Sequence, residues 1–234
     1  MKIELIKKLP KHVAEIIRLV GGIADKEGIS AYIVGGPVRD ILLDRKNHDL
    51  DFVVEGNAIE FAEVLNRTLK GTLKTHQPFC TATIEFNKER IDLATARSEV
   101  YKKIAAYPDV TPGFIKDDLF RRDFTVNAMA VSINRKSFGE LIDFYNGLND
   151  LKKGVVKVLH DKSFMDDPTR IFRAVRFAVR LKFRIDSRTK KLMKESILAG
   201  CLGEVNRGRI KKEVESFLKE KDPLKCLEEF SKLI

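Results

Sequence analysis

Cysteine is scarce in this sequence, with three among 234 residues. Cys80, Cys201 and Cys226 form no CxxC pair, and no histidine lies in an HxxxH pair or near a cysteine in a zinc-binding pattern. These spacings exclude the usual patterns of a disulfide framework or a zinc centre. We therefore expect no structural zinc, and a reducing, cytoplasmic compartment fits this cysteine usage best.

Long apolar runs are also missing. No uninterrupted apolar stretch approaches the length of a membrane-spanning helix, and the N-terminus lacks the apolar core of a signal peptide. The sequence therefore predicts no membrane partner. It also contains no internal repeat and no low-complexity linker.

Charge is abundant and unequal. The chain has 44 Lys and Arg against 34 Asp and Glu, a net charge of +10, and 44% of its residues are hydrophobic. This composition is typical of a soluble globular protein with a real core. The basic surplus favours a polyanionic partner, although simple solubility is the alternative interpretation.

Hydrophobic periodicity divides the chain into an α/β part up to about residue 160 and a helical part after it. The predicted helices are 11–27, 37–43, 57–69, 168–182, 187–198, 206–220 and 223–233. The predicted strands are 30–34, 49–54, 80–86, 89–95, 130–133, 141–143 and 155–158. Residues 101–117 contain two prolines and a glycine and are predicted as a loop. The last helix runs to the end of the sequence without an evident cap, which leaves a fragment or a protein without further helical domains as alternatives.

A glycine pair followed by two aspartates is the most informative pattern. Gly35-Gly36 ends one apolar run, and Asp49 and Asp51 open the next. Residues two apart on a strand project from the same face, so these carboxylates would supply two hard oxygen ligands for a divalent cation. Glycines allow backbone to approach phosphate closely. An isolated pair of this kind would more often be a strand cap or a turn.

A two-metal site usually requires a third carboxylate on a neighbouring strand. Residues 80–86 and 89–95 are predicted to form a hairpin with Asn87-Lys88 as its turn. Asp92, in the second strand of this hairpin, is the preferred candidate, because the hairpin should lie beside strand 49–54. Glu85 is the alternative. We therefore predict Asp49, Asp51 and Asp92 as catalytic residues, with Asp49 and Asp51 as metal ligands.

Four motifs resemble those of the class II tRNA nucleotidyltransferases and bacterial poly(A) polymerases, in the DNA polymerase beta nucleotidyltransferase superfamily. They are VGGPVRD at 34–40, DLFRRDFTVNAM at 118–129, DFYNGLNDL at 143–151 and DDPTRIFRAVRF at 166–177, in family order. The resemblance covers residues 33 to about 183. It implies an α+β fold, with a nucleotidyltransferase head (residues 1–160) whose mixed or antiparallel sheet is flanked by helices. An all-helical, RNA-binding neck (161–234) would follow.

The resemblance also implies roles for individual residues. The positions that match nucleotide-contacting residues are Gly35, Gly36, Arg39, Arg122, Asp123, Asn127, Asp167, Arg170, Arg173 and Arg176. Arg122 would pair with the triphosphate, while Asp123 would accept from a ribose hydroxyl or hold Arg122. Asp167 and Arg170 would pair with the Watson–Crick edge of the incoming base.

The fourth motif has a physical interpretation of its own. Arg170, Arg173, Arg176 and Arg180 recur at helical spacing and fall on one face, with apolar residues on the other. Such a stripe of guanidinium groups can bind base edges and phosphate. The alternative is an exposed basic face paired with carboxylates.

The predicted function is template-independent transfer of nucleotides to the 3′ CCA end of tRNA. Two Mg²⁺ ions would serve as cofactors, and ATP, CTP or both as substrates. A poly(A) polymerase shares all four motifs and is the alternative. More distant alternatives are a non-catalytic RNA-binding protein of the same fold and a dinucleotide-binding oxidoreductase, which would lack a role for the aspartate pair. The sequence leaves the added nucleotide and the oligomeric state open.

Overall fold

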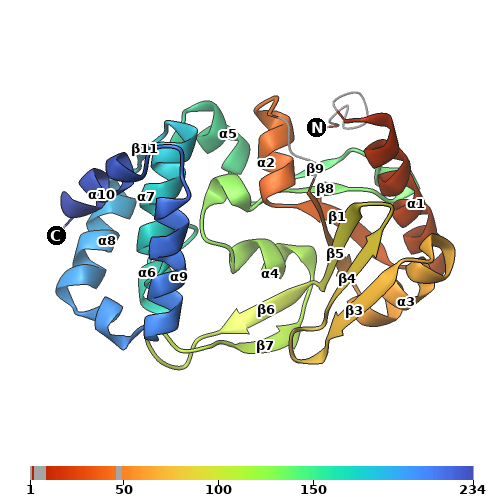
Figure 1. Ribbon diagram of the computed structural model, residues 1–234, viewed down its shortest axis with the longest axis horizontal. Helices are drawn as coiled ribbons and strands as arrows, with labels where there is room; N and C mark the ends of the chain where they lie inside the picture. The colour runs from red at the N-terminus through yellow and green to blue at the C-terminus, as the bar shows by residue number, and fades with distance from the viewer. Residues whose placement is uncertain (1, 3–8, 46–48, 234) are drawn as a thin grey trace. The chain divides into compact units, whose positions relative to one another are not determined.

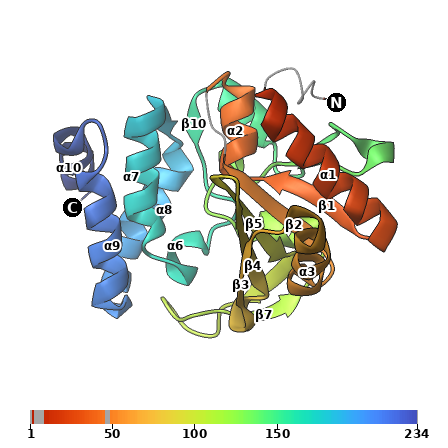
Figure 2. The same ribbon diagram turned by 45° about the vertical axis from the view of Figure 1, so that its right-hand side comes forward.

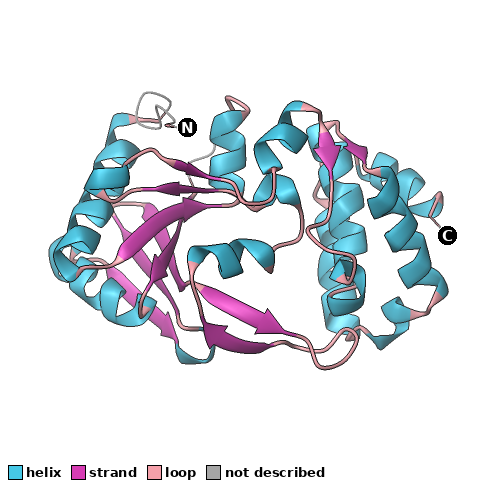
Figure 3. Cartoon of the chain, turned by 180° about the vertical axis from the view of Figure 1, so that it is seen from behind, coloured by secondary structure: helices cyan, strands magenta, loops and turns pink. Residues whose placement is uncertain are grey.

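The computed structural model describes residues 2, 9–45 and 49–233. These residues form two compact units. The first comprises Met1–Ser98, Val110–Arg121 and Asn127–Tyr145, and the second comprises Glu99–Asp109, Arg122–Val126 and Asn146–Ile234. Figure 3 shows the strands in magenta and the helices in cyan. The predicted domain boundary at residue 160 stays a prediction, because compact units need not coincide with functional domains.

The first unit is built on one seven-stranded mixed sheet with the order β3-β4-β5-β2-β1-β8-β9 (Figure 1). Its strands are β1 (Ser30–Val34), β2 (Leu50–Glu55), β3 (Thr72–His76), β4 (Thr81–Phe86), β5 (Glu89–Thr95), β8 (Ala130–Ser132) and β9 (Leu141–Ile142). Strands β2 and β5 pair in parallel, whereas β2 pairs with β1, and β5 with β4, in antiparallel orientation. A mixed sheet was predicted, and this prediction is confirmed.

Helices flank this sheet. Helix α1 (Lys11–Glu27) and helix α3 (Ala58–Leu69) pack against each other, α1 also against β1, and α3 against β4 and β5 (Figure 2). Helix α1 buries Val13, Ile17 and Val20 at helical spacing. Helix α2 (Gly36–Leu42) follows β1 directly, and α4 (Ile115–Phe120) packs against β2.

The second unit is mainly helical. Its helices are α5 (Gly147–Lys152), α6 (Ser163–Asp166), α7 (Arg170–Leu181), α8 (Ser187–Leu198), α9 (Arg207–Leu218) and α10 (Pro223–Ser231). Helix α7 packs against α9 and α10. Phe172, Phe217 and Phe230 join the three helices, and the rings of Phe172 and Phe230 stack with centroids 4.8 Å apart. No helix in the described part of the chain has the length and apolar character of a membrane span.

Smaller elements complete the described chain. Two short sheets are formed by β6 (Arg97–Val100) with β7 (Asp109–Pro112), and by β10 (Val155–Val156) with β11 (Arg184–Ile185). Single turns of 3₁₀ helix are η2 (Gln77–Phe79), η3 (Thr125–Asn127), η4 (Arg135–Ser137) and η5 (Cys201–Glu204).

Several sequence predictions were wrong. Residues 101–117 are not a continuous loop, because β7 and the start of α4 lie within them. The segment after Pro168 is not entirely helical, because β11 interrupts it, and α7 begins at Arg170 rather than at Pro168. Strands β3 and β7 escaped prediction because their side chains are mostly exposed and lack apolar alternation.

Candidate active site

A sharp turn connects β1 to α2. Gly35 has φ 69°, a region that favours glycine, and its N–H donates to the carbonyl of Met129 at 3.1 Å. Gly36 is the first residue of α2, and among the residues that the structure describes a Cβ at this position would come within 4 Å of the Nη2 of Arg39 alone, at 3.8 Å. The backbone of this turn is therefore uncovered by side chains of its own, as an approach of phosphate requires.

Arg39 is buried at the side of this turn. Its Nε and Nη2 donate to the two carboxylate oxygens of Asp40, both at 2.9 Å, and its Nη1 donates to Oδ1 of Asn127 at 2.7 Å. A forked guanidinium–carboxylate pair with a third hydrogen bond fixes the geometry of a buried charge. The structure thus brings together two predicted nucleotide-binding residues, Arg39 and Asn127. Their contact with nucleotide stays a prediction.

The sheet brings Asp51 and Asp92 together. Asp51 lies on β2, and its partner in the parallel register of β5 is Asp92. Partners in this register project from the same face of a sheet. The predicted position of the hairpin beside strand 49–54 is confirmed. Glu85 lies on β4, opposite Arg90 of β5, and forms an ion pair with Lys74. Asp92 lies on the strand that pairs with β2, so it is the better-placed third carboxylate.

Asp92 already has two partners. The hydroxyl of Thr83 donates to its Oδ1 at 2.6 Å, and the guanidinium of Arg90 donates to Oδ2 and Oδ1 at 2.8 and 3.0 Å. The carboxylates of Asp92, Glu85 and Asp51 raise the pKa of Arg90, with the hydrogen bonds to Asp92 as the largest cause. Arg90 is therefore surrounded by negative charge.

The donor set suits a hard divalent cation. Asp49 is exposed just before β2, Asp51 is half-buried two residues later, and carboxylate oxygens are the ligands that Mg²⁺ prefers. Within residues 2, 9–45 and 49–233, however, no three His, Cys, Asp or Glu side chains form a group able to hold a metal ion. Both oxygens of Asp92 accept hydrogen bonds from Arg90, a cation of the protein itself.

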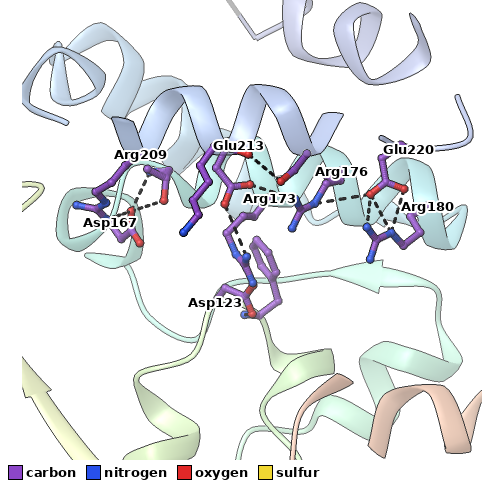
Figure 4. Close-up of polar contacts among 12 residues, drawn as sticks. Asp123, Asp167, Arg173, Arg176, Arg180, Arg209, Glu213 and Glu220 are labelled. Atoms are coloured by element: carbon purple, nitrogen blue, oxygen red, sulfur yellow. Dashed lines mark hydrogen bonds and ion pairs between the residues drawn. The ribbon is translucent and has the colours of Figure 1, made fainter. Parts of the chain in front are cut away.

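In the second unit, Asp123 holds an arginine of α7. Its Oδ2 accepts from Nε and Nη2 of Arg173 at 2.9 and 2.6 Å, and its Oδ1 accepts from the backbone N–H of Phe124 (Figure 4). The charge of Asp123 raises the pKa of Arg173. The sequence suggested ribose or Arg122 as the partner of Asp123 and missed Arg173. Arg122 itself is half-buried, and its pairing with triphosphate stays a prediction.

Two glutamates face the arginine stripe (Figure 4). Glu213 of α9 lies 3.8 Å from Arg173 and 3.4 Å from Arg176, and Glu220 lies 3.8 Å from Arg176 and pairs with Arg180. Burial lowers the pKa of Arg176. These three arginines are paired with carboxylates, as the alternative interpretation expected, but the face is not an exposed one, because Arg176 is only 11% exposed. The spacing of seven between the glutamates matches that between Arg173 and Arg180, a signal that sequence reasoning overlooked.

The predicted base-reading residues are also held by neighbours. Asp167 accepts from Nη2 of Arg209 at 2.7 Å, and the buried Arg170 donates to the hydroxyl of Ser163 at 2.7 Å. Arg209 further donates to the carbonyl of Ala105 at 2.9 Å. Arg209 was not predicted, and no sequence pattern singled it out.

The predicted site residues thus divide between the units. Asp49, Asp51, Asp92, Gly35, Gly36, Arg39 and Asn127 belong to the first, and Arg122, Asp123, Asp167, Arg170, Arg173 and Arg176 belong to the second.

Comparison with known proteins gives consistent matches. Residues 31–157 match the family described as poly A polymerase head domain. Over 204 residues, 87% of this chain and 25% of the relative, the chain is 48% identical to the A-adding tRNA nucleotidyltransferase of Aquifex aeolicus. It is similar to a CCA-adding enzyme in an apo form (TM-score 0.95, 46% identity, 98% of this chain and 54% of that one). It is also similar to a CCA-adding enzyme with ATP (TM-score 0.90, 42% identity, 100% and 55%). The chain spans about a quarter to about a half of the length of these proteins.

Proposed function

The chain belongs to the poly A polymerase head-domain family, in the nucleotidyltransferase superfamily, and on that premise we propose that it adds AMP, CMP or both to the 3′ CCA end of tRNA. One observation carries the proposal. The end of β1, where the Gly35-Gly36 turn follows, lies beside the start of β2 with Asp51, and Asp51 lies beside Asp92 of β5. Three adjacent strands thus bring the Gly35-Gly36 turn close to two carboxylates, those of Asp51 and Asp92.

In this proposal, Asp49 and Asp51 hold Mg²⁺, with Asp92 as the third carboxylate. When bound, a pair of such ions would orient the triphosphate and lower the pKa of the 3′-hydroxyl of the RNA. The backbone N–H of Gly36 would donate to a phosphate oxygen. Arg39, held by Asp40 and Asn127, would keep the turn in position.

The residues of the second unit would recognise the nucleotide. Asp167 and Arg170 would pair with the edge of the base, as the resemblance implies. Asp123 holds Arg173 by two hydrogen bonds, so this pair would present a fixed group to the nucleotide. The cytoplasm remains the predicted compartment.

Similarity leaves the added nucleotide undetermined. The A-adding relative is 48% identical to this chain and the CCA-adding structure 46%, a difference too small to choose between them. The experiment is incubation with labelled ATP or CTP and tRNAs that end before CCA, after C and after CC. Growth by one A, by CC or by CCA on a sequencing gel identifies the activity, and a long A-tail would instead indicate a poly(A) polymerase.

We expect Asp49→Ala and Asp51→Ala each to lower the rate of incorporation on the order of a thousandfold, because each removes a ligand of the metal that stabilises the transition state. Glu63→Ala, which removes an exposed carboxylate of α3, is the matched control and should leave the rate unchanged. Circular dichroism should be the same for all variants. An active Asp49→Ala/Asp51→Ala double variant would contradict the proposal and favour a non-catalytic RNA-binding protein.

A further inference from the structure

Arg90 binds the proposed third carboxylate through both of its oxygens. Its Nε lies 2.8 Å from Oδ2 of Asp92 and its Nη2 lies 3.0 Å from Oδ1. The ion pair is open to solvent, with side-chain exposures of 65% for Arg90 and 39% for Asp92. A forked pair of this kind occupies the oxygens that a divalent cation would need.

The register of the sheet explains this position. Asp92 has Asp51 beside it on β2 and Thr83 beside it on β4, while Arg90, two residues earlier on the same face, lies across from Glu85. Carboxylates this close together repel one another unless a cation is near.

We propose that Arg90 is a displaceable counter-cation of the metal site, which binds Asp92 in the metal-free protein and releases it when a divalent ion binds. This inference rests on the proposed function, in which Asp92 is a metal ligand. Arg90 is then a positioning residue. It reduces the repulsion between the carboxylates before the ion binds, and it competes with the ion for Asp92.

Two features make the exchange feasible. An exposed ion pair contributes little to stability, so breaking it costs little. The hydroxyl of Thr83, which donates to Oδ1 of Asp92 at 2.6 Å, is neutral and does not repel an incoming cation. Thr83 can therefore keep the carboxylate oriented while Arg90 moves away.

The test measures the affinity of the full chain for Mn²⁺ by electron paramagnetic resonance, without nucleotide or RNA. We expect Arg90→Gln to bind Mn²⁺ about threefold more tightly than the unsubstituted protein. The substitution removes a competing interaction whose free energy is that of an exposed ion pair. If Arg90 instead supports Asp92 in the metal-bound state, Arg90→Gln will bind Mn²⁺ more weakly. Unchanged or weaker binding overturns the proposal.

Lys74→Gln is the matched control. It removes the same charge from the same sheet, but Lys74 binds Glu85, at 3.0 and 3.1 Å, and not Asp92. Lys74 lies two strands from Asp92, which is about 10 Å at the usual strand spacing. Salt at about 0.15 M screens charges beyond about 8 Å, so the effect of Lys74→Gln on Mn²⁺ affinity should be small. If Lys74→Gln tightens binding as much as Arg90→Gln does, general electrostatics accounts for the effect and the proposal fails.

A double-mutant cycle isolates the step through Asp92. In the Asp92→Asn background, Arg90→Gln should no longer tighten Mn²⁺ binding, and an undiminished effect overturns the proposal. If the proposed function is wrong, the result is different: the unsubstituted chain then shows no Mn²⁺ binding that depends on Asp51. That result contradicts both the proposed function and the role of Arg90. Normal binding without the Arg90 effect removes the present inference alone.

Discussion

Single arginines have very different environments in this protein. Arg39 is buried and donates three hydrogen bonds, two to Asp40 and one to Asn127. Arg90 is exposed and binds one carboxylate, that of Asp92. Arg176 lies between these cases, since it is mostly buried and its Nε is a buried atom with no hydrogen-bond partner. Because the cost of moving a guanidinium increases with its burial and with its hydrogen bonds, Arg39 is suited to a fixed role and Arg90 to exchange.

His160 gives a pH prediction at the residue scale. Burial, and next the charge of Arg170, lower its pKa below the ordinary value of 6.5. The unfolded chain therefore binds more protons at this histidine than the folded protein does in mildly acidic solution. Stability from this group is present above about pH 6.5 and is lost as the pH falls toward the folded-state pKa.

We expect His160→Asn to lose less stability than the unsubstituted protein between pH 7.5 and pH 5.5, as measured by urea unfolding at both values. Asp166, whose pKa burial raises, is present in both proteins, and its contribution has the opposite sign because it is lost as the pH rises. Equal losses in the two proteins would show that His160 is not the group responsible.

Helix α1 illustrates what decides packing at the scale of elements. Two consecutive glycines lie in its interior, and only Gly21 is buried. A Cβ on Gly21 would lie 2.1 Å from the backbone oxygen of Ile133, while a Cβ on Gly22 would meet no atom of the described residues within 4 Å. The first glycine therefore permits close contact between the helix and the chain after β8, and the second has no such role.

These neighbours form a matched pair of variants. Gly21→Ala should destabilise the protein by about 2 kcal/mol, because a backbone oxygen must move. Gly22→Ala should stabilise it by about 1 kcal/mol, the difference in helix propensity. Thermal or urea unfolding measures both, and a similar effect of the two substitutions would contradict the packing described for α1.

At the scale of the whole molecule, the basic surplus is unevenly distributed. Residues 146–234 contain 22 Lys and Arg against 13 Asp and Glu, whereas residues 1–145 contain 22 against 21. The first unit draws on the balanced part and the second mainly on the basic part. This asymmetry favours the second unit as the one that contacts the RNA backbone.

We expect Lys190→Ala/Lys194→Ala, which removes two exposed charges of α8, to weaken tRNA binding and to lower the slope of log affinity against log salt by about one for each phosphate that the lysines neutralise. Lys11→Ala/Lys26→Ala on α1 is the control with the same charge change. Filter binding over a range of salt concentrations measures the slopes. Equal slopes for the two double variants would argue against this role for α8.

Much of the fold was encoded locally. The amphipathic period of 11–27, the apolar run of 30–34 and the helix 187–198 match α1, β1 and α8 residue for residue, because each segment carries its own period. The turn at Asn87-Lys88 was also predicted, and both residues have positive φ. Strand β3 was not predicted, since an exposed edge strand needs no apolar alternation.

The sequence by itself determined which residues are proposed for the chemistry, namely the Gly35-Gly36 turn and the aspartates at 49 and 51. The tertiary structure decided which side chains lie next to the proposed site residues. It placed Asp92 beside Asp51 in a parallel register and formed an ion pair between Asp92 and Arg90. It also placed Glu213 within ion-pair distance of Arg173 and Arg176. The reason is physical: period and turn preference act within a few residues, whereas the partner of a charged side chain is set by strand order and helix packing among segments far apart in the chain.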